Sequence, residues 1–127
     1  MNLTRGKREA VVVLSTRHLG KKWSKNFNCL TFVREVYREV GVEIPLVYSH
    51  TLPPKDFSIS VDNLNSWYEG DILFLKRRGY AGERTWTHVG ITLPGEKLIH
   101  CSEYFGGQVT ITPKEEIFSF YHYVLSG

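Results

Sequence analysis

The spacing of apolar residues changes near Gly70 from a helical pattern to a strand-like one, and this order limits the folds that the chain can adopt. Before Gly70, the segment 29–40 repeats apolar residues at the spacing of one helix face. After Gly70, short runs rich in β-forming residues follow one another, at 71–77, 87–93, 97–102, 108–112 and 119–125. Helices followed by such strands predict an α+β domain in which the N-terminal helices pack on a central antiparallel β-sheet.

The N-terminal part predicts two helices and a long connection. The segment 7–19 has helical periodicity, although its run of three valines keeps a strand interpretation open. The second helix spans 29–40, where Asn28 is suited to cap the start and Gly41 to end it. From 42 to 69 the sequence contains several Pro, Ser and Asn residues, which predicts a loop. Long loops of this kind often wall or cover a binding site.

Length, charge and cysteine content narrow the class of protein. At 127 residues, the whole chain 1–127 is expected to form a single domain that needs neither disulfides nor a structural metal. Two cysteines give no sign of a disulfide framework, and a net charge of +3 is too mild to predict nucleic-acid binding. In the absence of a nucleic-acid motif, basic residues near Trp and Tyr leave single-stranded nucleic acid only as a minor alternative.

No targeting or membrane-spanning segment is visible in this sequence. The apolar stretch AVVVL is too short for the core of a secretory signal and is closed by Arg17 and His18. No stretch approaches the length of a membrane-spanning helix. We therefore expect a cytoplasmic protein in a reducing compartment, or a protein exported without a cleaved signal.

Cys29 stands at the start of the second predicted helix, and the sequence allows two interpretations of it. A thiol at a helix N-terminus is next to unpaired backbone N–H groups, which lower its pKa and favour the reactive thiolate. A buried core thiol is the more common use of cysteine, however. For a nucleophile we expect a pKa well below the ordinary value of about 8.5 and a histidine base nearby.

His88 and His100 are the histidines suited to act as such a base and its partner. They are twelve residues apart, on two strand-like runs that flank the turn 94–96. A three-residue loop that pairs Leu93 with Lys97 puts both histidines on one face of the sheet, whereas a two-residue loop puts them on opposite faces. The even spacing therefore permits a shared face without requiring it.

Several stretches, taken in order, resemble one family. The order is NC…TFV on a helix, then GDILFL, then HVGITLPGEKLIHCS, and the stretch HLGKKW (18–23) precedes them. This order is similar to the NlpC family of papain-like cysteine peptidases, which are bacterial cell-wall endopeptidases and amidases, over roughly residues 8–112. The resemblance implies a papain-like α+β fold in which Cys29 is the catalytic nucleophile, His88 the general base and His100 the polar residue that orients His88.

The sequence around the nucleophile departs from the family pattern. Where the family has an acid before the cysteine and Ser-Gly after it, this chain has Asn28 and Leu30-Thr31. Family members that cut peptidoglycan stem peptides use that acid and serine to hold a free amino group. The resemblance implies a hydrolase that cleaves amide bonds by a Cys-His-His triad, with a peptidoglycan stem peptide or a related amide as its partner. A deamidase or acyltransferase of the same superfamily, and a catalytically inactive groove-binding module, remain alternatives.

The other residues with reactive, polar or aromatic side chains near the site are predicted to line the substrate groove or to lie in the core. Cys101 directly follows His100, so we expect it to face the other side of the sheet as a core thiol. No cofactor is expected, and the spacing of Cys29, His88 and His100 matches no usual zinc motif. Residues near the nucleophile, on the long loop and before His88 are predicted to line the substrate groove: Trp23, Asn28, His50, Trp86 and Thr87.

Overall fold

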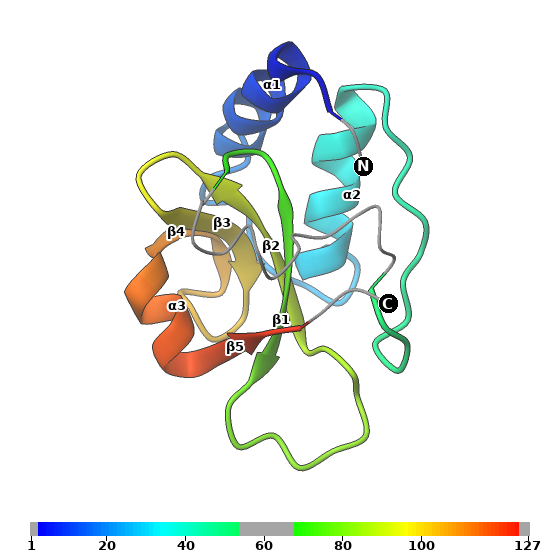
Figure 1. Cartoon of the computed structure of the whole chain (residues 1–127), viewed down its shortest axis with the longest axis vertical. Coiled ribbons are helices and arrows are strands. Elements are labelled where there is room, and N and C mark those ends of the chain that lie inside the picture. The colour runs from blue at the N-terminus through cyan, green and yellow to red at the C-terminus, as the bar shows by residue number, and fades with distance from the viewer. Residues whose placement is uncertain (1–2, 54–67, 125–127) are drawn as a thin grey trace.

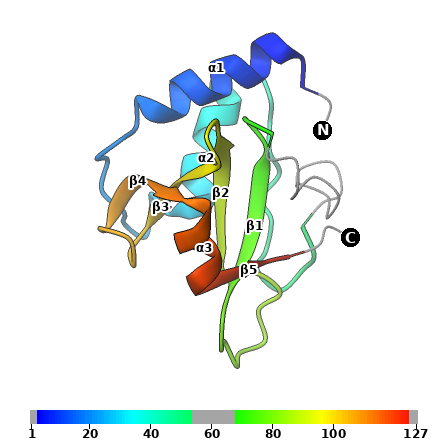
Figure 2. The same ribbon diagram turned by 60° about the vertical axis from the view of Figure 1, so that its left-hand side comes forward.

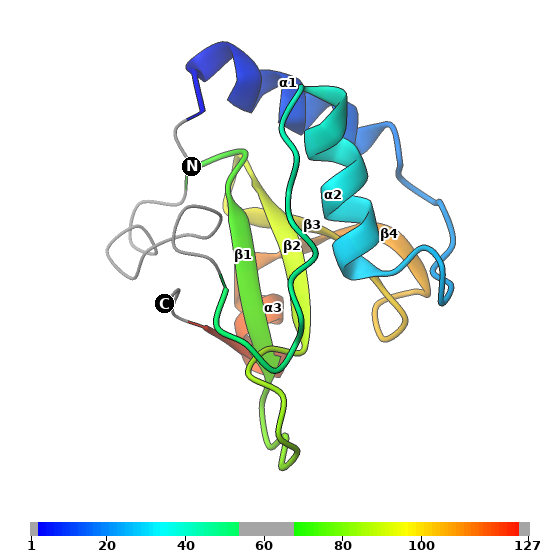
Figure 3. The ribbon, with the colours of Figure 1, turned by 90° about the vertical axis from the view of Figure 1, so that its right-hand side faces the viewer.

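The computed structural model describes residues 3–53 and 68–124, and within them the α+β prediction is confirmed. The helices are α1 (Arg5–Thr16), α2 (Cys29–Glu39) and α3 (Lys114–Phe120). The strands are β1 (Ile72–Arg77), β2 (His88–Leu93), β3 (Lys97–Ser102), β4 (Gln108–Pro113) and β5 (Tyr121–Tyr123). The strands pair antiparallel in the order β4-β3-β2-β1-β5. Helix α2 covers one face of this sheet, α1 packs against α2, and α3 lies on the other face (Figures 1 and 3).

A local cap and contacts with the sheet together stabilise the helix that carries the expected nucleophile. The side-chain oxygen of Asn28 accepts hydrogen bonds from the backbone N–H groups of Leu30 and Thr31, both at 3.1 Å, and so caps the start of α2. The Tyr37 hydroxyl donates to the carbonyl of Gly70, at the entry to β1. The inner face of α2 is buried against the sheet through Phe32, Val33, Val36 and Tyr37. The second predicted helix is therefore confirmed.

The helix interpretation of the first segment is also confirmed, although its ends are shifted. Helix α1 begins after its cap residue Thr4 and ends at Thr16, earlier than predicted. The guanidinium group of Arg8 lies 2.5 Å from the carboxylate of Asp71 and also donates to the carbonyl of Glu69. This ion pair fixes α1 against the start of β1, so Asp71 contributes to the structure.

The register of the central hairpin decides where the two histidines lie. Leu93 pairs with Lys97, so the loop between β2 and β3 has three residues, 94–96. Of the two registers that the sequence allows, this is the one that puts His88 and His100 on the same face of the sheet, the face that carries α3. On the opposite face, residues of the same two strands join the larger core under α2: Val89, Ile91, Leu93, Ile99 and Cys101.

The C-terminal segment differs from the strand predicted at 119–125. Lys114–Phe120 forms a helix, and among the described residues the strand is limited to Tyr121–Tyr123, which pairs with β1 (Figure 2). Two acidic residues in the first turn of α3 suit the positive end of a helix. Ile117 is fully buried in a smaller core on the α3 face of the sheet, whose other buried members are Leu73, Leu75, Leu98 and Tyr121. The aromatic run that suggested one strand is thus divided between a helix and an edge strand.

The predicted loop 42–69 is described in part. Residues 42–53 contain no helix or strand and run alongside α2 toward its N-terminal end (Figure 3). They are attached to that helix, because Ile44 is buried and its carbonyl accepts a hydrogen bond from the Arg34 side chain at 2.9 Å. Residues 54–67 of the predicted loop lie outside the described residues.

Candidate active site

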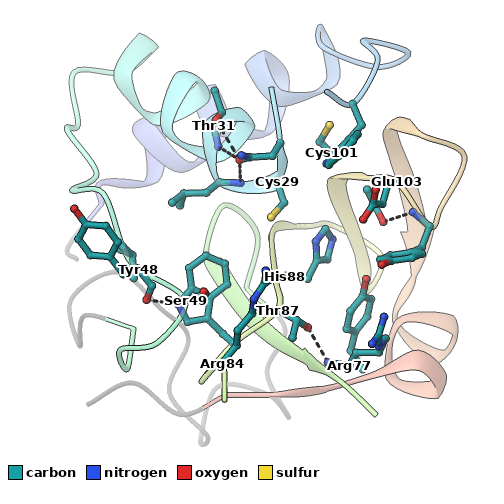
Figure 4. A pocket seen from close by; sticks show the side chains of 18 of the residues that line it. Cys29, Thr31, Tyr48, Ser49, Arg77, Arg84, Thr87, His88, Cys101 and Glu103 are labelled. Carbon is teal, nitrogen blue, oxygen red and sulfur yellow. Dashed lines mark hydrogen bonds between the residues drawn. The ribbon is translucent and has the colours of Figure 1, made fainter. Parts of the chain in front are cut away.

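A pocket of about 720 Å³ opens at the N-terminal end of α2 (Figure 4). The side chains of Cys29 and His88 both contribute to its wall, so the predicted nucleophile and the predicted base share one cavity. Four of the five residues that were predicted to line a groove also line this pocket: Trp23, Asn28, Trp86 and Thr87.

The fifth predicted groove residue, His50, lies elsewhere. Among the described residues, His50 is exposed and is not part of the pocket wall, which is formed instead by its neighbours Tyr48 and Ser49. The backbone N–H of Trp86 donates to the Ser49 carbonyl, and its indole N–H donates to the Tyr48 carbonyl at 3.1 Å. These bonds hold residues 48 and 49 against the pocket and leave His50 in the turn beyond them.

Cys101 is a buried thiol on the face of the sheet away from the histidines, as predicted. Its sulfur donates a hydrogen bond to the Phe27 carbonyl at 3.6 Å. It also lines the pocket with Cys29 (Figure 4), and both cysteines are free.

The thiol of Cys29 differs from the sequence-based expectation of a lowered pKa. Cys29 as a whole is partly exposed, but its thiol group is buried. This burial raises the pKa of Cys29 to about 11. Backbone hydrogen bonds at Val89 and Leu30 act in the opposite direction, as expected at a helix start, but their effect is smaller. The expected low pKa is therefore wrong for the resting protein, because desolvation of the thiolate outweighs the helix N-terminus.

A chain of hydrogen bonds runs behind His88. Its Nε2 lies 2.7 Å from Nδ1 of His100, and Nε2 of His100 lies 2.8 Å from the hydroxyl oxygen of Thr112. All three side chains are buried, with exposed fractions of 4%, 0% and 4%. One face of the His88 ring stacks on the Tyr121 ring, with the two ring centroids 5.1 Å apart. These contacts fix the His88 ring and leave its Nδ1 as the nitrogen available to a reacting group.

Both histidines are held in their neutral form. The pKa of His88 is lowered well below its ordinary value of 6.5, first by burial and second by the neighbouring His100. Burial also lowers the pKa of His100 to about 4. At neutral pH the site therefore combines an uncharged thiol with an uncharged imidazole.

Cys29 and His88 share the pocket without a direct bond. The histidine expected near Cys29 is present in the same pocket, but the part of the chain that the structure describes contains no hydrogen bond between the Cys29 sulfur and the His88 ring. Both side chains point into the same cavity (Figure 4).

Sequence reasoning missed two residues beside the histidines. Tyr121 was placed in a predicted strand without a role, yet it stacks on His88 and lines the pocket. Thr112 was also unassigned, although a signal for it exists: it follows His100 by twelve residues, as His100 follows His88. Equal even spacings across three neighbouring antiparallel strands can bring the same face of each strand into contact.

The resting state of the thiol leads to a first prediction. We expect iodoacetamide to modify Cys29 slowly at pH 7, with a rate that rises about tenfold per pH unit toward pH 11, because the thiolate is the species that reacts. Peptide mass spectrometry at each pH separates Cys29 from the buried Cys101. A rate that reaches its plateau near pH 7 would show that Cys29 rests as a thiolate and would contradict the raised pKa of this thiol.

Among the described residues, no group of three or more His, Cys, Asp or Glu side chains is arranged to hold a metal ion. No helix within residues 3–53 and 68–124 is long and apolar enough to cross a membrane.

A helix packed on an antiparallel sheet, with a thiol at the helix start and a histidine of the sheet in the same pocket, is the arrangement of a papain-like α+β fold. The chain belongs to the NlpC/P60 family, whose profile matches residues 17–126. A search of curated proteins found no match to the chain.

Solved structures agree with this family. The NlpC/p60 domain of the peptidoglycan hydrolase SagA is 25% identical, with 94% of this chain and 98% of that chain covered and a TM-score of 0.66. An NlpC/P60 family protein from Bacillus cereus is 19% identical, with 93% and 39% covered and a TM-score of 0.72. The peptidoglycan hydrolase RipB from Mycobacterium tuberculosis is 20% identical, with 97% and 67% covered and a TM-score of 0.65. The last two likenesses show the fold, and the chain spans 39% of the Bacillus cereus protein.

Proposed function

We propose that this protein is a cysteine hydrolase that cleaves amide bonds in cell-wall peptides, with Cys29 as nucleophile, His88 as general base and His100 as the residue that orients His88. One observation carries the proposal: the Cys29 thiol shares a pocket with a histidine that is fixed from behind by a second buried histidine. Family membership supports it, and SagA and RipB are both described as peptidoglycan hydrolases.

The proposed reaction starts from two neutral groups. Nδ1 of His88 accepts the thiol proton of Cys29 while the sulfur attacks the amide carbon and forms a C–S bond. The backbone N–H of Cys29, at the start of α2, meets the negative oxygen that develops. His88 then gives its proton to the leaving amine as the C–N bond breaks. Water hydrolyses the thioester, which releases the acid and restores the thiol.

The charges around the pocket favour peptides that carry carboxylates. Among the described residues of its wall, four are basic and one, Glu103, is acidic; the basic residues are Lys25, Arg34, Arg77 and Arg84. Arg77 is partly buried, and its guanidinium carbon lies 5.7 Å and 5.8 Å from the ring centres of Tyr80 and Tyr104. Asn28 caps the helix and has no charge to offer an ammonium group. An anionic peptide therefore suits this pocket better than a cationic one.

This charge pattern gives a second prediction. For a peptide substrate, we expect conversion of one side-chain carboxylate to a carboxamide to lower kcat/KM about tenfold, the typical effect of one charge-assisted hydrogen bond. Arg77→Gln should reduce this difference. The control is Arg38→Gln, which removes an exposed arginine of α2 that pairs with Glu43 outside the pocket. Equal rates for the two peptides in the unmodified protein would refute the preference.

The proposed function is tested with defined muropeptides and a library of amides. The protein and its Cys29→Ala variant are incubated with each compound, and the products are weighed by mass spectrometry. Addition of water across a peptide amide, absent with the variant, supports the proposal. Exchange of a carboxamide for a carboxylate, with water taken up and ammonia released, would indicate a deamidase, and transfer of the acyl group to an added amine would indicate an acyltransferase. No change in any compound would leave a groove that binds without catalysis and refute the proposal.

A further inference from the structure

The hydrogen-bond chain behind His88 continues past His100 to Thr112. We infer that Thr112 is a positioning residue for the proposed reaction: its hydroxyl oxygen accepts the Nε2–H of His100 and thereby keeps Nδ1 of His100 open to accept the Nε2–H of His88. The inference rests on the proposed function and extends its catalytic trio by one residue on the next strand.

The proposed reaction determines which group donates and which accepts in each of these two hydrogen bonds. When His88 takes the thiol proton at Nδ1, both of its ring nitrogens carry hydrogen, so Nε2–H must donate to Nδ1 of His100. His100 then carries its own hydrogen on Nε2, and that hydrogen needs an acceptor. The Thr112 hydroxyl oxygen, 2.8 Å away, supplies it. In the reverse arrangement two N–H groups would face each other across 2.7 Å as soon as His88 became charged.

Both partners of this hydrogen bond are buried. His100 has an exposed fraction of 0% and Thr112 of 4%, so a missing hydroxyl would leave a buried N–H group without a partner. The geometry is set by strand pairing, because Thr112 on β4 is opposite Leu98 and Thr110 is opposite His100. Thr112 therefore reaches the His100 ring diagonally across one face of the sheet.

Kinetics of three variants test this role. Thr112→Val keeps the shape and removes the hydroxyl, and we expect kcat to fall about tenfold to a hundredfold while KM stays nearly constant. Thr112→Ser keeps the hydroxyl and should restore most of kcat. The control is Thr110→Val, the same change two residues away on the same face of β4. An unchanged kcat in Thr112→Val, a Thr112→Ser variant as slow as Thr112→Val, or an equal loss in Thr110→Val would each overturn the inference.

A second measurement needs neither a variant nor turnover. With ¹⁵N-labelled histidine, the ring nitrogen signals of the unmodified protein at pH 7 report which nitrogen of each buried ring carries hydrogen. We expect His88 and His100 both to carry it on Nε2, with Nδ1 bare. Hydrogen on Nδ1 of His100 would overturn the role of Thr112 as acceptor. Because this result does not depend on a substrate, failure of the proposed function and failure of the Thr112 role are distinguishable.

Discussion

Replacement of Cys29 by alanine is expected to lower kcat on a cleaved peptide by at least about 10⁴-fold, because removal of a nucleophile eliminates the covalent route. Binding should persist, since the pocket wall is formed by many other residues. Turnover and peptide affinity are measured on the same preparation. A variant that keeps more than a few per cent of its activity would assign the chemistry to another group.

The matched control for this variant is Cys101→Ala. Cys101 carries the same chemical group and borders the same pocket, but its sulfur belongs to the core under α2 and contacts the Phe27 carbonyl. We expect most of the activity to remain and the free energy of unfolding to fall by about 1 kcal/mol. A loss of turnover equal to that of Cys29→Ala would show that the two thiols act together.

His88→Ala is the change with the second largest expected effect. The variant lacks the group that accepts the thiol proton and returns it to the leaving amine, so kcat should fall about 10²- to 10⁴-fold. His122→Ala on β5 is the control, because His122 is exposed. Added imidazole should restore part of the activity of His88→Ala and leave His122→Ala unchanged. A His88→Ala variant that turns over as fast as the unmodified protein would exclude His88 as the base.

Much of the fold could be predicted because local signals agreed with one another. Asn28 was expected to cap the second helix, and it does so with two hydrogen bonds. The three-residue loop at 94–96 was one of two possible registers, and the sequence could not choose between them, because both keep alternation along each strand. Pairing of the whole sheet decides that choice.

The C-terminal helix shows why one segment was mispredicted. The aromatic residues near 118–123 have a strong preference for strands, and they conceal the helix Lys114–Phe120. The acidic first turn and the burial of Ile117 in the smaller core stabilise the helix. Tertiary packing of this kind is not visible in a short window of sequence.

The sequence predicted which candidate side chains come together but not their charge state. Cys29, His88 and His100 were proposed from spacing and family resemblance, and the structure places two of them in one pocket and the third behind it. The low pKa expected for Cys29 was wrong, because the helix position shows which backbone groups are near and does not show how deeply the thiol is buried. Thr112 was not assigned, because its contact with His100 forms across a pair of strands.

The central claim is that Cys29 forms a thioester with the acyl part of the substrate. The most direct measurement mixes the protein with a cleaved peptide, stops the reaction in acid within milliseconds to seconds, and determines the mass of the intact protein and of its digested peptides. The account predicts an added mass equal to the acyl fragment, located on the peptide that contains Cys29 and absent from the Cys29→Ala variant. Turnover that proceeds with no adduct at any time, or with the adduct on Cys101, would contradict it.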